Sequence, residues 1–148
     1  MKSKVKLILT ILLILTILIS CSPQTPPPTP SPTPEGDTAY NDGTYTAKGE
    51  TDDKGWTPEA TIVIKDGKIT EARYDEFSSE SSTFKTEDEE YKENFMNINK
   101  VDIVKVYERF GNELVENQDP NKVDATGGAT SSGNKFIELA NKALKQAQ

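Results

Sequence analysis

A proline-rich stretch restricts what this chain of 148 residues can fold into. Residues 22–34 contain seven prolines separated by Thr, Ser and Gln. Proline fixes φ and lacks a backbone donor, so the stretch favours an extended polyproline II helix and cannot form a core. At ~3.1 Å per residue it reaches roughly 40 Å. We therefore expect a linker over residues 21–41 and one folded domain over residues 42–148.

The residues before the linker are typical of a secretory signal peptide. Lys2, Lys4 and Lys6 form a basic start, and residues 7–19 are apolar apart from two threonines. These thirteen residues are too few for a membrane-spanning helix, which needs ~20. An uncleaved N-terminal anchor is the alternative. We expect residues 1–20 to be removed.

Cys21, which follows directly, is the only cysteine of the chain, so no intramolecular disulfide can form. The apolar Leu18 and the small Ser20 before it suit a signal peptidase. A cysteine thiol can carry a thioether-linked diacylglycerol, and two acyl chains anchor a protein stably. We expect Cys21 to be lipidated and to hold the domain at the extracytoplasmic face of the cell membrane.

The charge and composition exclude several functions. Residues 1–20 contain three lysines and no acid, so the mature chain has 14 basic and 24 acidic residues and a net charge of −10. Such acidity argues against nucleic acid as a partner. The chain has no histidine, which excludes His-based catalytic triads and His metal sites.

Alternating apolar and polar residues predict strands over residues 43–49, 60–65 and 68–74. Asp66-Gly67 lies between the last two and favours a type I′ hairpin turn.

Ideal pairing in this hairpin sets Ile64 opposite Ile69 but Ile62 opposite Glu71. We therefore expect either a bulge in the second strand or an exposed far end.

Three helices are expected after the strands. Thr86 and Glu89 form a capping box for the first helix, residues 101–116 form the second, and Ser131 or Ser132 caps the last. The sequence thus predicts an α+β fold, a small antiparallel sheet with an N-terminal hairpin packed by two or three helices. Apolar side chains at helical spacing are expected in the core: Tyr91, Phe95, Ile98, Ile103, Tyr107, Phe110, Leu114, Phe136, Ala140 and Ala143.

A glycine-rich loop over residues 122–133 leads directly into the last helix. Free amides and the dipole at a helix start can bind an anion, and Gly127 and Gly128 permit a close backbone approach. Thr130 lies at the mouth of this site. No lysine follows the glycines, so the loop is not a Walker loop. A plain connection capped by serine is the alternative.

The loop resembles the flavinylation motif of FMN-binding domains in the flavin-carrying subunits of Na⁺-pumping quinone reductases and Rnf complexes. That motif reads Asp, two variable residues, Ser or Thr, Gly, Ala, then Ser or Thr. Asp124, Gly128, Ala129 and Thr130 match, whereas Gly127 departs from the hydroxyl position. The resemblance implies that Thr130 carries FMN through a phosphoester, installed from FAD by a separate flavin transferase.

Further segments are similar to small FMN-binding lipoproteins of Gram-positive bacteria, a group that includes the sex-pheromone-precursor lipoproteins. They are residues 42–45, 55–57, 65–69 and 85–91. The resemblance implies a membrane-tethered FMN electron carrier that receives electrons from a membrane quinol-linked donor and is not itself an enzyme.

The remaining candidate contacts follow from the loop and its surroundings. We expect backbone donors at Ser131 and Ser132 to bind the phosphate, and Asp124 to orient the loop or the transferase. Trp56 either stacks on the flavin ring or is a structural tryptophan. Two alternatives stay open: a non-redox surface-binding lipoprotein that keeps the fold without covalent flavin, and an active peptide released from the signal sequence.

Overall fold

The structure is a computed structural model that describes residues 40–148. The predicted signal peptide, Cys21 and nearly all of the linker lie outside the described residues. Within the described part the chain forms β1 (Gly43–Lys48), β2 (Trp56–Lys65), β3 (Lys68–Ser78), β4 (Thr83–Phe84), α2 (Glu89–Asn99), α3 (Ile103–Asn117), a short 3₁₀ helix (Pro120–Lys122) and α4 (Thr130–Lys145).

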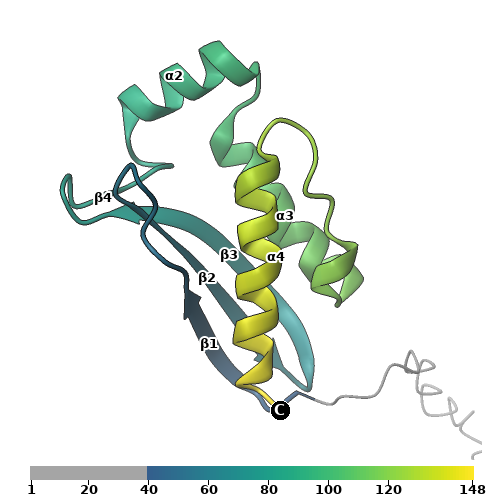
Figure 1. Cartoon of the computed structure of the whole chain (residues 1–148). Helices are drawn as coiled ribbons and strands as arrows, with labels where there is room; N and C mark the ends of the chain where they lie inside the picture. Colours follow the sequence, from purple (N-terminus) through teal and green to yellow (C-terminus); the bar gives the residue numbers. More distant parts are fainter. Residues whose placement is uncertain (1–39) are drawn as a thin grey trace, which may run out of the picture. The chain divides into compact units, whose positions relative to one another are not determined.

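The four strands form one antiparallel sheet in the order β1-β2-β3-β4. The helices α3 and α4 lie on one face of this sheet, and α2 lies beyond its end (Figure 1). The predicted α+β fold with an N-terminal hairpin is confirmed. None of the helices over residues 40–148 combines the length and the apolar character that crossing a bilayer requires.

The hairpin between β2 and β3 has the predicted turn. Asp66 and Gly67 both adopt positive φ, 54° and 71°, as a type I′ turn requires. The predicted bulge is also present, because the register shifts after the Ile64–Ile69 pair so that Ile62 faces Ala72.

This bulge has a consequence for the rest of β3. It turns every second residue from Ala72 onwards toward the helices, including Tyr74 and Glu76, both of which are buried. Both strands of the hairpin are longer than predicted, since β2 begins at Trp56 and β3 continues to Ser78. The prediction ended β3 too early because Glu76, a charged residue, occupies a position of that strand that faces the core.

The core lies between the sheet and the pair α3 and α4. The predicted core side chains of these two helices are buried, and the rings of Phe110 and Phe136 stack with centroids 5.9 Å apart. Gly111 allows α3 to lie directly on β3, since a Cβ atom there would be 2.2 Å from the carbonyl oxygen of Ala72. The backbone of β3 therefore sets how close α3 approaches.

The helix α2 differs from expectation. It begins at Glu89 with Asp88 as its cap, whereas the predicted cap, Thr86, donates instead to Asp75. Ile98 was expected in the core but is 78 % exposed. The physical reason is that α2 extends past the end of the sheet, so its last turn has no core surface beneath it.

The start of α4 also differs. The helix begins at Thr130, and its N-cap residue is Ala129, so the predicted cap at Ser131 or Ser132 is wrong. Both serines lie inside the first turn. The hydroxyl of Ser132 bonds to groups on β3 and α3 instead.

Candidate functional site

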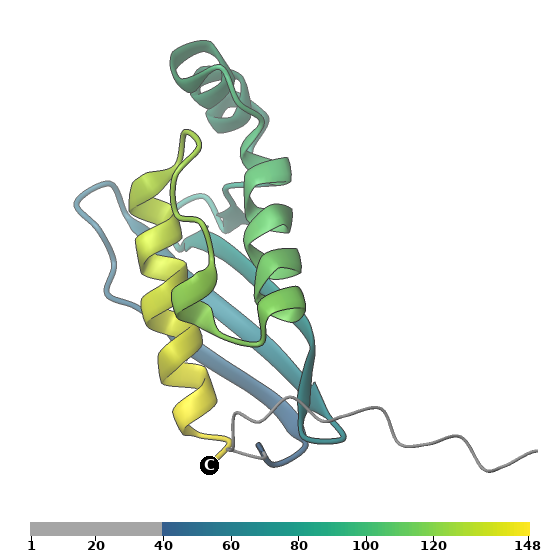
Figure 2. The same cartoon turned by 90° about the vertical axis from the view of Figure 1, so that its right-hand side faces the viewer.

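The junction between the glycine-rich loop and α4 leaves a threonine hydroxyl at an open helix end. The loop rises to the level of the start of α3 and then turns into α4 (Figure 2). Thr130 is exposed, and no side chain of the described residues caps the helix at Ala129. The first amides of the helix, together with its dipole, can therefore bind an anionic group next to the Thr130 hydroxyl.

The loop backbone requires glycine before this threonine. Gly127 and Gly128 have φ of 83° and 95°, a region that side chains disfavour. A Cβ atom at Gly128 would also lie 2.6 Å from Val101, and one at Gly127 would lie 3.3 Å from Nη2 of Arg109. Gly127 departs from the Ser or Thr of the motif, but glycine suits the positive φ that the backbone adopts at this position.

Asp124, the first residue of the motif, shapes the loop. Its Oδ1 accepts from both the amide (2.8 Å) and the hydroxyl (2.6 Å) of Thr126. These two hydrogen bonds hold the pKa of the Asp124 carboxyl below its usual range. Thr126 thus supplies a hydroxyl to the loop one position before Gly127.

Two residues of α3 hold the same loop from the other side. Arg109 donates to the carbonyl oxygens of Asp124 (3.0 Å) and Thr126 (2.8 Å), and Glu113 accepts from the amide of Asp124 (2.7 Å). Arg109 and Glu113 also pair with each other at 2.9 Å. The only signal for this clamp in the sequence is an Arg–Glu pair four residues apart, which is common on exposed helix faces.

A fully buried carboxylate lies beside the first turn of α4. Oε1 of Glu76 accepts from the hydroxyls of Tyr74 (2.9 Å), Tyr107 (3.1 Å) and Ser132 (2.8 Å). Burial raises the pKa of both tyrosines, and the negative charge of Glu76 adds to that effect, so both remain donors. The backbone amide of Ser132 was expected to bind the phosphate, and its hydroxyl donates to this carboxylate.

Two lysines neutralise Glu76. Its Oε2 accepts from Nζ of Lys85 (2.8 Å) and of Lys135 (3.0 Å), and Lys135 also lies 3.4 Å from Oδ2 of Asp52. Burial alone would raise the pKa of Glu76, but the hydrogen bond and charge of Lys85, together with the hydrogen bonds from Ser132 and Lys135, outweigh it and lower the pKa to about 2. Although burial works against it, the hydrogen bond from Lys135 to Glu76 raises the pKa of Lys135.

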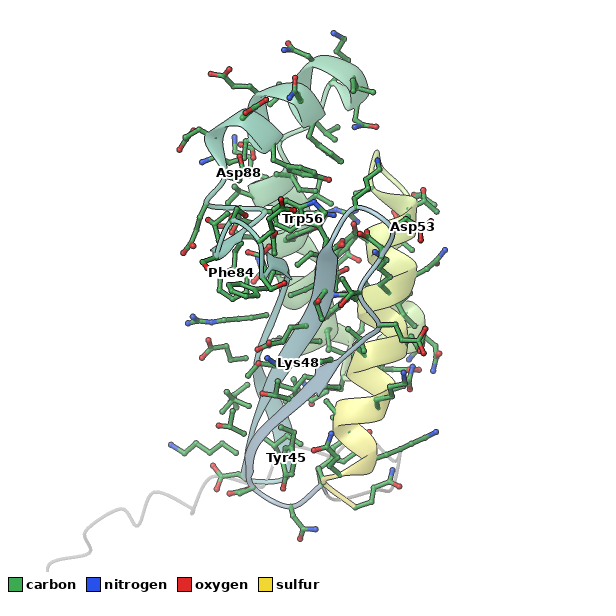
Figure 3. The ribbon with its side chains drawn as sticks, turned by 60° about the vertical axis from the view of Figure 1, so that its left-hand side comes forward. Tyr45, Lys48, Asp53, Trp56, Phe84 and Asp88 are labelled. Carbon is green, nitrogen blue, oxygen red and sulfur yellow. The ribbon has the colours of Figure 1, made fainter. Side chains whose placement is uncertain are left out.

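Trp56 lies at the end of the sheet beneath α2 (Figure 3). It is buried, packs edge-on against Tyr91 with centroids 5.5 Å apart, and has the Lys85 ammonium 5.2 Å from its ring centroid. A chain of contacts thus runs from Trp56 through Lys85 and Glu76 to Ser132 in α4. Trp56 is connected to α4 through Lys85 and Glu76, and its own ring is covered by other residues of the protein.

Comparison with known proteins identifies the family. The FMN-binding domain family matches residues 55–145, more than half of the chain. The chain is 27 % identical over 107 residues, 72 % of its length and 75 % of the relative's, to a 15 kDa lipoprotein of Treponema pallidum.

Two solved structures are also similar. A crystal structure of a Clostridium perfringens protein is 38 % identical with a TM-score of 0.68, covering 73 % of this chain and 88 % of that one. A solution structure from Clostridium thermocellum is 28 % identical with a TM-score of 0.50, covering 72 % and 92 %. The residues around Thr130 fit a phosphate-bearing cofactor, and this chain belongs to the FMN-binding domain family, with FMN as its cofactor.

Proposed function

We propose that this protein is an FMN-carrying lipoprotein that transfers electrons at the extracytoplasmic face of the cell membrane, with FMN attached to Thr130 through a phosphoester. The observation that carries the proposal is the exposed Thr130 hydroxyl at the uncapped start of α4, directly after the Gly127-Gly128-Ala129 segment. The chain's membership in the FMN-binding domain family supports FMN as the attached group.

The attachment reaction needs an external enzyme. The Thr130 oxygen forms a bond to the flavin-side phosphorus of FAD, the pyrophosphate bond breaks, and AMP leaves. The hydroxyl proton goes to a base of the flavin transferase, because a threonine hydroxyl is a weak nucleophile without one. Thr130 is exposed at the first position of α4, which leaves its hydroxyl accessible to such an enzyme.

The residues around Thr130 have separate roles in this proposal. The first-turn amides of α4 bind the phosphate, and the two glycines leave room for it. Asp124, Arg109 and Glu113 hold the loop in its shape. When bound, FMN supplies reversible electron transfer, whereas the protein supplies position and electrostatics.

The N-terminal residues supply the tether. The signal-like segment, Cys21 and the proline-rich linker, together with the similarity to a lipoprotein of Treponema pallidum, support a lipid anchor with a reach of roughly 40 Å. Such a reach lets the flavin accept electrons from a quinol-linked membrane donor. Mass spectrometry of the unmutated protein is expected to find residues 1–20 removed and a diacylglycerol on Cys21, and an unmodified Cys21 would contradict lipidation.

The test of attachment is co-expression with a flavin transferase, followed by flavin fluorescence in a denaturing gel. The unmutated protein and Thr130→Ser, which keeps a hydroxyl, are expected to fluoresce, whereas Thr130→Ala is expected to be dark and still folded. A dark band from the unmutated protein would overturn covalent attachment and favour the non-redox surface-binding lipoprotein.

A further inference from the structure

We propose that the buried Glu76 is a positioning residue for flavin attachment, which acts through Ser132 to hold the first turn of α4 so that Thr130 and free amides face the phosphate. The proposal rests on the proposed attachment at Thr130. Glu76 is on β3 and fully buried, so it does not reach the cofactor itself.

The direction of the Ser132 hydroxyl is the first argument. A polar side chain at the third position of a helix can reach back to the N-cap amide, and one at the N-cap accepts from a first-turn amide, so either would occupy a donor that an anion could use. Ser132 is the third residue of α4, and Ala129 is its N-cap. Here the hydroxyl donates to Glu76 at 2.8 Å and lies 3.1 Å from the hydroxyl of Tyr107. Because Glu76 engages Ser132 and Ala129 has no side-chain oxygen, the amides stay available.

The second argument is that α4 is fixed to Glu76 at two points. Ser132 and Lys135 lie about one helical turn apart, and they bind the two different carboxylate oxygens, at 2.8 Å and 3.0 Å. Between them, Gly133 packs closely against the glycine-rich loop, since a Cβ atom at this position would lie 2.7 Å from Cα of Ala125. A small shift of α4 would break these contacts, so Glu76 fixes where Thr130 stands.

The third argument concerns charge. A carboxylate next to the phosphate site would repel the phosphate if it were unpaired. Lys85 and Lys135 both bind Oε2 of Glu76, and Lys85 is itself nearly buried. The network therefore anchors the helix through a strong acceptor without placing a net negative charge beside the site.

The test compares two substitutions that each remove one hydroxyl donor from the same carboxylate oxygen. Ser132→Ala removes the donor on α4, whereas Tyr74→Phe removes one on β3 and keeps the ring that packs edge-on against Phe136 of α4. Ser132→Thr restores the hydroxyl. Two quantities are measured: the rate of flavin attachment with transferase in excess, and amide hydrogen exchange over residues 133–136 in the flavin-free protein, since the amide of Gly133 makes the first hydrogen bond of the helix, to the carbonyl oxygen of Ala129.

We expect Ser132→Ala to slow attachment on the order of ten-fold and to speed exchange over residues 133–136, whose amides are bonded to the first turn. Tyr74→Phe is expected to lower the melting temperature about as much as Ser132→Ala does, while the attachment rate and the amide exchange stay near those of the unmutated protein. Ser132→Thr is expected to recover the attachment rate.

Equal rates and equal exchange in Ser132→Ala and Tyr74→Phe would overturn the proposal. If the unmutated protein accepts no flavin, the proposed function fails. The exchange measurement still decides in that case whether Glu76 holds the first turn through Ser132.

Discussion

Replacement of Glu76 by glutamine probes the buried network with little change of shape. The amide oxygen can keep facing Lys85 and Lys135, and the amide NH₂ can donate to the hydroxyls of Tyr74 and Tyr107, which then turn to accept. The substitution therefore removes the negative charge while retaining hydrogen-bond partners. Lys85, whose side chain is 7 % exposed, loses its counter-ion, whereas Lys135 keeps Asp52.

The magnitude follows from two routes. Removing one partner of a buried ion pair costs about 3–5 kcal/mol, because an uncompensated charge remains. Independently, the pKa of Glu76 is lowered to about 2 from the ordinary 4.5, and at 1.36 kcal/mol per unit that corresponds to roughly 3 kcal/mol. We expect Glu76→Gln to lower the free energy of unfolding by about 3 kcal/mol, out of the roughly 5–15 typical of a domain.

The assay is urea unfolding followed by the fluorescence of Trp56, the chain's only tryptophan. Glu59→Gln is the matched control on the adjacent strand, since Glu59 pairs with the exposed Lys48 at 2.7 Å and such surface pairs contribute about 0–1 kcal/mol. A loss below about 1 kcal/mol for Glu76→Gln, or one equal to the control, would refute the reasoning.

Three further predictions concern other contacts. Gly111→Ala is expected to lower the free energy of unfolding by about 1–3 kcal/mol despite its better helix propensity, because its Cβ would lie 2.2 Å from the oxygen of Ala72; calorimetry of the variant checks it. Arg109→Met removes two bonds to loop carbonyls, so proteolysis within residues 122–130 is expected to be faster, and an unchanged rate would contradict the clamp. The lowered pKa of Glu76 gives stability that is fully present above its ordinary value and is lost as the pH falls from about 4.5 toward about 2; acid titration of Glu76→Gln should show a shallower loss.

Much of the architecture follows from local patterns in the sequence. The Asp66-Gly67 turn, the bulge implied by Ile62 and Glu71, and the apolar spacing of α3 and α4 all appear in the structure. These features are set by backbone conformation and by periodic burial within one element, which adjacent residues reveal.

The site itself is less visible in the sequence. The predicted strand ends at residue 74, so the buried Glu76 was missed, and with it the link between Ser132, which was expected at the site, and Tyr107, which was expected in the core. Only the tertiary fold brings five donors from four segments to one carboxylate. The same carboxylate diverts Ser132 from the cap that its position predicts. Arg109 was missed because its contacts are loop carbonyls, which carry no sequence signature.

The central claim is tested most directly by locating the flavin on the chain. Trypsin is expected to release residues 123–135 as one peptide, since Lys122 precedes it and Lys135 ends it. After co-expression with a flavin transferase, fragmentation mass spectrometry should place the mass of FMN on Thr130. An unmodified peptide, or FMN on Thr126 or Ser131 instead, would contradict the account.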